Sequence, residues 1–242
     1  MSEHTWIVVP GYNEERHIEA VIEDLHMHGY RNIVVVDDGS KDSTGEAARR
    51  AGATVLTHII NRGQGASLKT GIDFAISQGA DYVVTFDSDG QHQANDIKIM
   101  IKLLKTGDVD VVLGSRFLPY ASHQGSSPSY QGASPSQAIP LSRRILLKGS
   151  IFVIRLFYGM AMTDAHNGFR ALSRHACERI EIRSNRMEHA SEIINEIKRN
   201  NLRYVERPVT IRYNDPRHLQ GAGSYLGAIR IFLKMVLHKI MR

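Results

Sequence analysis

The sequence predicts an α/β protein with a mainly parallel central sheet and helices on both faces. Short runs rich in β-branched residues recur along the first half of the chain, and each is followed by apolar residues at helical spacing. This alternation is typical of βαβ units, whose crossover helices cover both faces of a parallel sheet. The strands expected on this basis are residues 7–9, 33–37, 55–57, 82–87 and 110–114.

Helices are expected wherever apolar residues recur every three or four positions. The second half adds a strand at residues 204–213, which Pro208 confines to a sheet edge because proline has no backbone N–H to donate. That half therefore reads as α+β. The helices expected are residues 18–25, 66–75, 145–157 and 188–199.

Two later segments have a distinct composition. Residues 118–142 are rich in Ser, Pro, Gly and Gln, which predicts a long flexible loop. It could serve as a lid or be a disordered insertion. Residues 224–242 place apolar side chains on one helical face and basic ones on the other. This amphipathic helix could pack on the domain or dock on an anionic membrane.

Composition limits the class of protein. The 242 residues are enough for one α/β domain, and an excess of 30 Lys and Arg over 25 Asp and Glu favours an anionic partner. Cys177 is the single cysteine, which excludes a disulfide framework and predicts a reducing, cytoplasmic location. No signal peptide and no apolar run of about 18 residues is present, so membrane contact is expected to be peripheral.

An acidic pair follows the apolar run at residues 82–86. Asp87 and Asp89 are expected just past the carboxyl end of a buried strand, where open α/β sheets bind ligands. Alternate residues of an extended segment point the same way, so the two carboxylates could converge on one hard cation that also bridges phosphate oxygens. The structural alternative is a surface Asp-Gly turn.

A second acidic strand end lies at residues 34–40. Its presence argues against the interpretation of Asp87 and Asp89 as a simple surface turn. Like charges at one sheet edge are costly without a ligand, so the two ends suggest one crevice. Asp38 could accept hydrogen bonds from a base or ribose. Three following residues are assigned the structural role of capping the next helix: Asp42, Ser43 and Thr44.

The first predicted strand ends at residues 10–14. Pro10 and Gly11 break the strand, Tyr12 offers a stacking face and Glu14 opens a helix. On its own this segment is a turn. Together with the two acidic strand ends, it supplies a third wall of the expected crevice.

Several segments, in this order and spacing, resemble the family 2 inverting glycosyltransferases. They are residues 10–14 (PGYNE), 36–40 (VDDGS), 61–66 (NRGQGA), 87–91 (DSDGQ) and 114–116 (GSR). Residues 163–170 (TDAHNGFR) resemble the branch that contains dolichyl-phosphate mannose synthases and bacterial polyprenyl-phosphate glycosyltransferases. The resemblance covers nearly the whole chain.

The resemblance implies one GT-A domain with a Rossmann-like nucleotide-binding fold, a nucleoside-diphosphate-sugar donor and an Mg²⁺ or Mn²⁺ ion. It divides the chain into a nucleotide-sugar-binding half (1–117), the loop (118–142), an acceptor half (143–223) and the terminal helix (224–242). Its functional positions fall on Pro10, Tyr12, Glu14, Asp38 and Asp87 for the nucleotide, on Asp87, Asp89 and Gln91 for the metal and diphosphate, on Arg116 for a phosphate, and on Asp164, Asn167 and Arg170 for the acceptor side. Arg170 could equally be a structural ion-pair partner.

One departure concerns the acceptor. Relatives that use polyprenyl phosphates often carry a basic pattern ending in Ser-Lys before the last helix, and residues 220–225 lack that lysine. Arg212, Arg217 and His218 could substitute for it. Many relatives also carry membrane helices, so the absence of a membrane-spanning run here is a second observation against a membrane acceptor.

The proposed chemistry is leaving-group stabilisation. Departure of the nucleoside diphosphate gives the transition state oxocarbenium character, and the metal with Asp89 and Arg116 would neutralise the developing charge. A lipid phosphate acceptor needs no base, whereas a glycan hydroxyl does. Glu188 and Glu192 share a helical face, and either could be that base, with Glu192 the first candidate; a solvated helix face is the alternative.

Sugar transfer to a polyprenyl phosphate is the leading hypothesis. A family 2 enzyme acting on a glycan hydroxyl in cell-surface polysaccharide synthesis is the first alternative. A sugar nucleotidyltransferase is less suitable because residues 10–14 lack basic side chains. A non-catalytic nucleotide-binding module is the remaining alternative, and nucleic-acid binding is not expected because basic residues are not grouped with aromatic ones.

Overall fold

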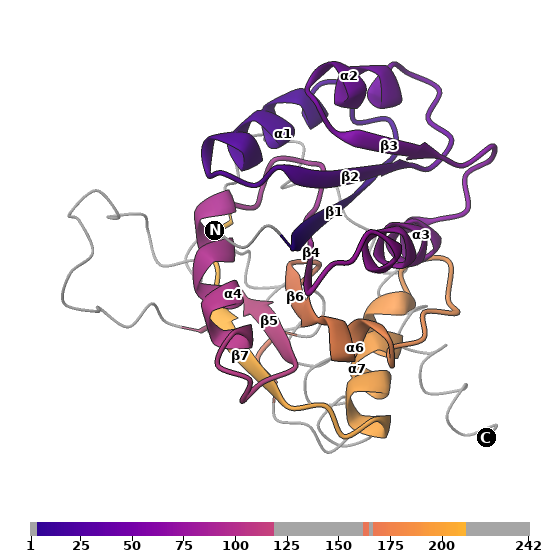
Figure 1. The fold of residues 1–242 in the computed structure, drawn as a ribbon. Helices are drawn as coiled ribbons and strands as arrows, with labels where there is room; N and C mark the ends of the chain where they lie inside the picture. The colour runs from indigo at the N-terminus through magenta and orange to yellow at the C-terminus, as the bar shows by residue number, and fades with distance from the viewer. Residues whose placement is uncertain (1–3, 119–161, 165–166, 212–242) are drawn as a thin grey trace.

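The computed structural model describes residues 4–118, 162–164 and 167–211. Seven strands form one sheet in the order β3-β2-β1-β4-β6-β5-β7 (Figure 1). Among the described strands β6 alone is antiparallel to its neighbours, β4 and β5, and the other pairs are parallel. The predicted mainly parallel sheet is confirmed. Its strands are β1 (Thr5–Gly11), β2 (Asn32–Asp37), β3 (Thr54–Thr57), β4 (Tyr82–Thr85), β5 (Val111–Ser115), β6 (Arg170–Ser173) and β7 (Tyr204–Pro208).

Helices cover both faces of the sheet, as predicted. The apolar stripes of α1, α2 and α4 share one core with alternate strand residues such as Ile7 and Val9, whereas Val8 faces the opposite core with α3, α6 and α7. This alternation follows from the two-residue period of a strand. The helices are α1 (Ile18–Met27), α2 (Thr44–Arg50), α3 (Gln64–Ser77), the 3-10 turn η1 (Ala94–Asp96), α4 (Ile97–Leu104), α6 (Arg174–Cys177) and α7 (His189–Arg199).

Helix α3 packs against the sheet with a glycine at the contact. A methyl group at Gly71 would overlap Cγ1 of Val8 on β1 and would lie 3.2 Å from Cγ2 of Val36 on β2. The small side chain brings the helix axis toward the strands. As a result, the first turn of α3 lies beside the carboxyl ends of β1 and β2.

Two strands are shorter than predicted. Strand β4 ends at Thr85; the amide of Phe86 still donates to the carbonyl of Val8 at 2.9 Å, and residues 88–90 then form a turn. Strand β7 ends at Pro208 instead of residue 213, and it lies at the sheet edge beside β5, as expected for a strand that carries proline.

Several predicted features lie outside the described residues. These are the loop 118–142 beyond residue 118, the helices 145–157 and 224–242, and the basic and glycine-rich positions 212–225. Within the described ranges, no helix is long and apolar enough to span a bilayer.

Candidate functional site

The predicted site residues gather at the carboxyl edge of the sheet. Gly11 at the end of β1 pairs with Asp37 at the end of β2, and the amide of Asp38 donates to the carbonyl of Gly11 at 2.8 Å. Strand β4 runs parallel to β1, so its acidic end emerges at the same edge. The sheet therefore brings the three strand ends together.

Asp38 is buried and is held by donors on both carboxylate oxygens. Its Oδ1 accepts from the Arg62 amide at 2.9 Å and lies 2.7 Å from Nδ1 of His58, and its Oδ2 accepts from the Gly63 amide at 2.6 Å. Nε2 of His58 lies 3.0 Å from Oγ1 of Thr70 on α3. Asp38 thus fixes the segment that leads into α3. His58 was not predicted as a site residue, because it follows β3 as an isolated histidine with no motif around it.

The turn after β1 is tied to the first residue of α2. The amide of Glu14 donates to Oγ1 of Thr44 at 2.8 Å, and Oε2 of Glu14 lies 2.9 Å from Nδ1 of His17. Tyr12 is 41% exposed, which leaves its ring accessible for stacking, whereas Pro10 is buried within β1. These residues therefore form a wall whose accessible group is the tyrosine.

Capping of α2 differs partly from the prediction. Asp42 accepts from the Thr44 amide at 3.1 Å and from the Thr44 hydroxyl at 2.5 Å, but Ser43 makes no side-chain capping bond. Asp42 also accepts from the amide of Glu15 at 3.2 Å. Asp42 therefore organises both the helix start and the preceding turn.

Asp87, predicted to lie on the donor side, is held by two neighbouring side chains. Gln64 at the start of α3 donates through Nε2 to Oδ1 at 3.1 Å, and Nε2 of His92 lies 2.9 Å from Oδ2. Burial alone would raise the pKa of Asp87, but the hydrogen bond and charge of His92 and the nearby Arg170 hold that pKa below its usual value. The carboxylate is therefore anionic and oriented.

Asp89 does not share an extended segment with Asp87, because the chain turns at residues 88–90. The alternation that was expected to aim both carboxylates in one direction is therefore absent. Instead, Oδ1 of Asp89 accepts from the Gln91 amide at 3.0 Å and Oδ2 accepts from Nε2 of Gln91 at 2.8 Å. The turn itself brings Asp89 and Gln91 together.

Arg116 and Asp164 form a two-pronged ion pair. Nε and Nη2 of Arg116 donate to the two oxygens of Asp164 at 2.6 and 2.8 Å, and the Arg116 amide adds a third bond at 3.1 Å. The Asp164 side chain is only 1% exposed, and that of Arg116 is 15% exposed. Arg116 is thus oriented by the acceptor-side aspartate.

Arg170 lies in the interior between the two acidic groups. It is 2% exposed, and burial lowers its pKa to about 10 against the opposing charges of Asp87 and Asp164. A guanidinium with that pKa remains charged at neutral pH. The site therefore alternates positive and negative groups from Arg116 through Asp164 and Arg170 to Asp87, and the burial of Arg170 favours an indirect role over contact with an acceptor.

His189 is a further member of this cluster that the sequence did not identify. It is 2% exposed, its Nδ1 lies 2.7 Å from the carbonyl oxygen of Arg186, and burial together with the charge of Arg170 lowers its pKa to about 4. The ring is neutral at pH 7. His189 lies on the first turn of α7. The sequence does not show that this residue lies near Arg170 and Asp87, because only the tertiary fold brings α7 to them.

Three buried polar atoms at the site have no hydrogen-bond partner within the described part of the chain. They are Nδ1 of His92, Nδ2 of Asn167 and Nη1 of Arg170. The side-chain oxygen of Asn167 accepts from the Phe169 amide at 3.0 Å, so the side-chain nitrogen, Nδ2, takes no part in that hydrogen bond. Buried polar atoms without a partner are rare, and these three lie on residues around Asp87 and Asp164, which marks that region as a polar environment.

Glu192, the predicted base, binds the backbone. Its Oε2 accepts from the amides of Arg183 and Ser184 at 3.0 and 2.8 Å. Glu188 lies at the N-cap position of α7. Because two amides share one oxygen of Glu192, its evident role is to hold the segment before α7.

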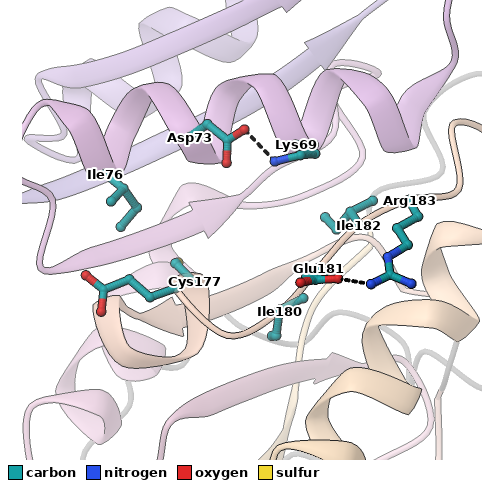
Figure 2. Close-up of a pocket in the computed structure, with 9 residues that line it drawn as sticks. Lys69, Asp73, Ile76, Cys177, Ile180, Glu181, Ile182 and Arg183 are labelled. Carbon is teal, nitrogen blue, oxygen red and sulfur yellow. Dashed lines mark hydrogen bonds and ion pairs between the residues drawn. The ribbon is translucent and has the colours of Figure 1, made fainter.

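A separate pocket of about 430 Å³ lies between α3, α6 and the segment that joins α6 to α7 (Figure 2). Lys69 pairs with Asp73 at 2.6 Å on its α3 side, and Arg183 pairs with Glu181 on the opposite side. Its nine lining residues include none of the predicted site residues. The pocket is therefore distinct from the cluster at the strand ends.

Two archaeal proteins are similar to nearly the whole chain. An uncharacterized protein of Methanocaldococcus jannaschii is 35% identical over 97% of this chain and 92% of its own length. The UDP-N-acetylglucosamine–dolichyl-phosphate N-acetylglucosaminyltransferase of Methanococcus voltae is 29% identical over 97% and 96%.

A solved structure shares the fold. Glucosyl-3-phosphoglycerate synthase from Mycobacterium tuberculosis, in complex with Mn²⁺, UDP and glucosyl-3-phosphoglycerate, superposes with a TM-score of 0.66 at 17% identity, covering 96% of this chain and 78% of that one. The chain thus has the predicted GT-A fold. The model of glycosyl transferase family 2 matches residues 6–181, which include the strand ends and the Arg170 segment. The chain belongs to glycosyl transferase family 2.

Proposed function

We propose that the chain transfers a sugar from a UDP- or GDP-sugar to a polyprenyl phosphate. The observation that carries the acceptor half is the state of the acceptor-side carboxylates. Asp164 is engaged by the guanidinium of Arg116, and Glu192 by two backbone amides. A glycan hydroxyl would require such a carboxylate as a base, whereas a phosphate arrives already ionised.

The relatives support the same acceptor class. The M. voltae enzyme, which matches 97% of this chain, is named for transfer to dolichyl phosphate. It is also named for a UDP-sugar, whereas the exposed ring of Tyr12 can stack on either uracil or guanine, and Asp38, predicted to contact the base, is buried and bonded to the segment before α3. We therefore leave both donor bases in the proposal.

The donor side fits a hard divalent cation. Asp87, Asp89 and Gln91 offer two carboxylates and an amide oxygen, the ligand type that Mg²⁺ and Mn²⁺ prefer. The described residues contain no cluster of three acidic, histidine or cysteine side chains, so the donor diphosphate would complete the coordination. When bound, the cation supplies Lewis-acid stabilisation of the leaving diphosphate.

The chain's own residues position the reacting groups. Gln64 and His92 orient the carboxylate of Asp87, and Asp164 presents the guanidinium of Arg116 in a fixed plane. An oriented guanidinium stabilises negative charge on a phosphate through charge-assisted hydrogen bonds. Both contributions are present before the substrates bind.

The reaction balances without a proton acceptor. An anionic oxygen of the lipid phosphate donates its electron pair to the anomeric carbon, and the bond from that carbon to the nucleotide diphosphate breaks. The nucleoside diphosphate leaves with the electron pair. Attack opposite the leaving group inverts the anomeric centre, consistent with the inverting family that the sequence resembles.

The test combines donor binding with transfer. We expect one class of UDP- or GDP-sugar to raise the melting temperature with Mn²⁺ present, and the chain then to move that sugar onto a polyprenyl phosphate. Asp89→Ala should abolish transfer, whereas Asp108→Ala, in an exposed turn, should not. Transfer to a glycan hydroxyl only, release of pyrophosphate, or full activity of Asp89→Ala would refute the proposal.

A further inference from the structure

Three exposed apolar side chains form what we call the rim patch: Ile59, Ile60 and Met187. They are 99, 68 and 52% exposed. Other large exposed apolar residues, Met27 and Ile99, are single positions on α1 and α4, which is normal for a protein surface. The rim patch differs because two adjacent isoleucines belong to it and because a second segment joins them.

The two segments meet at the first turn of α3. The amides of Gly65 and Ala66 donate to the carbonyl oxygen of Asn185 at 2.8 and 3.2 Å. A Cβ at Gly63 would overlap that same oxygen and would lie 3.0 Å from Cγ of Arg186. Figure 1 shows the connection after β3 and the connection before α7 on the same side of α3. The rim patch is therefore built by the tertiary fold.

These segments, residues 59–64 and 182–187, carry three arginines, and two glutamates, Glu181 and Glu188, directly flank the second one. Arg62 and Arg186 are exposed, and Arg183 pairs with Glu181 at the far end of the second segment. Exposed isoleucine and methionine beside arginine form the combination that enters the interface of an anionic bilayer.

The rim patch also borders the candidate site. The amide of Gly63 donates to Asp38, and the side chain of Gln64 donates to Asp87. Only a few residues therefore separate Ile60 from both acidic strand ends. A bilayer seated on the rim patch would lie next to the edge of the sheet where the donor is proposed to bind.

We propose that the rim patch docks the protein on an anionic lipid bilayer. The purpose of this docking rests on the proposed polyprenyl-phosphate acceptor, whose chain is held in a membrane. The docking itself needs no turnover. Apolar contact by Ile59, Ile60 and Met187 supplies the membrane affinity, and Arg62 and Arg186 supply the preference for anionic headgroups.

The experiment measures sedimentation of the full chain with vesicles of phosphatidylcholine, with and without phosphatidylglycerol. We expect the wild type to bind the anionic vesicles. The double variant Ile59→Ser, Ile60→Ser should bind them with an affinity reduced by at least about tenfold. Arg62→Ser with Arg186→Ser should remove the preference for phosphatidylglycerol. Met27→Ser, which alters an equally exposed residue on α1, should bind as the wild type does.

Equal vesicle binding by the isoleucine double variant and the wild type would overturn the inference, as would a wild type that does not bind anionic vesicles. A change of oligomeric state in that variant, without a change in vesicle binding, would assign the patch to a second copy instead. Transfer to a short-chain polyprenyl phosphate in detergent separates the two proposals. Docking through the patch with no transfer refutes only the proposed function, and transfer with patch-independent vesicle binding refutes only the docking.

Discussion

The carboxylate of Asp87 packs directly against the backbone of Gly168. A Cβ at residue 168 would lie 2.7 Å from Oδ2 and 2.8 Å from Oδ1 of Asp87. Both separations are shorter than normal contacts. The glycine therefore allows Asp87 to hold its bonds to Gln64 and His92, and the orientation of a donor-side carboxylate depends on a residue more than 80 positions away.

Gly168→Ala should displace Asp87 and reduce sugar transfer on the order of 100-fold, because a displacement of about 1 Å at a reacting site has that effect. Steady-state transfer and thermal melting measure the two consequences. Gly107→Ala is the matched control: in the turn before β5 its Cβ would meet nothing within 4 Å, but a φ of +77° is unfavourable for alanine, so it should destabilise the fold by about 1–2 kcal/mol while folded molecules keep their turnover. Normal transfer by Gly168→Ala would contradict the explanation.

Glu192→Gln distinguishes a structural glutamate from a catalytic base. The amide oxygen of glutamine still accepts from the amides of Arg183 and Ser184, so we expect transfer within about twofold of wild type and a stability loss of about 1 kcal/mol. A general base would instead contribute on the order of 100-fold or more. Initial rates at saturating substrates decide, and a loss of that size would restore Glu192 as the base and favour a hydroxyl acceptor.

His189 should make stability depend on pH. Its folded-state pKa of about 4 is below the unfolded value of 6.5, so between these values the unfolded chain binds the proton and the folded chain does not. Its contribution is complete above pH 6.5 and is lost as pH falls toward 4, amounting to about 3 kcal/mol. Urea unfolding of wild type and His189→Gln across this range should show the smaller pH slope in the variant. His175→Gln, at an exposed position, should keep the wild-type slope.

Asp110 should give a second pH dependence, at lower pH. It accepts from the amide, Nε and Nη2 of Arg203 at 2.9, 3.0 and 3.0 Å, and these bonds hold its pKa below the usual value. The stabilisation is present above the unfolded pKa near 3.9 and is lost as pH falls through the folded value. Because Arg203 is 57% exposed, we expect Asp110→Asn to cost about 1–2 kcal/mol at pH 7. The difference between variant and wild type in chemical denaturation should shrink below pH 4; a constant difference would exclude the ion pair as its cause.

The parts of the fold that were predictable depend on local sequence. β-Branched runs and helical periodicity identify β1 to β5, α1 and α3, but not α4, and parallel strands place the ends near Asp38 and Asp87 at one edge. The first half of the candidate site follows from those two facts. Strand ends were less accurate, as at Thr85, because pairing with a neighbour determines where a strand stops.

The remaining features depend on contacts between distant segments. Burial of Arg170 results from the placement of β6 between β4 and β5, and nothing in residues 163–170 specifies it. His58 and His189 reach the site through packing of α3 and α7, and Glu192 meets the segment before α7 only after that segment folds back. A periodic pattern contains no information about such partners.

The insertion of β6 has a consequence for synthesis of the protein on the ribosome. Strands β4 and β5 emerge well before β6, so the nascent chain has two incomplete sheet edges until the polypeptide has passed residue 173. Unpaired edges of this kind are templates for wrong strand pairing, and long-range closure of a sheet is slow. The same late strand carries Arg170 into place. Asp87 therefore acquires its buried counter-charge in the same folding step that joins β4 to β5, so a chain that stalls before that step presents neither a continuous sheet nor a charge-balanced site.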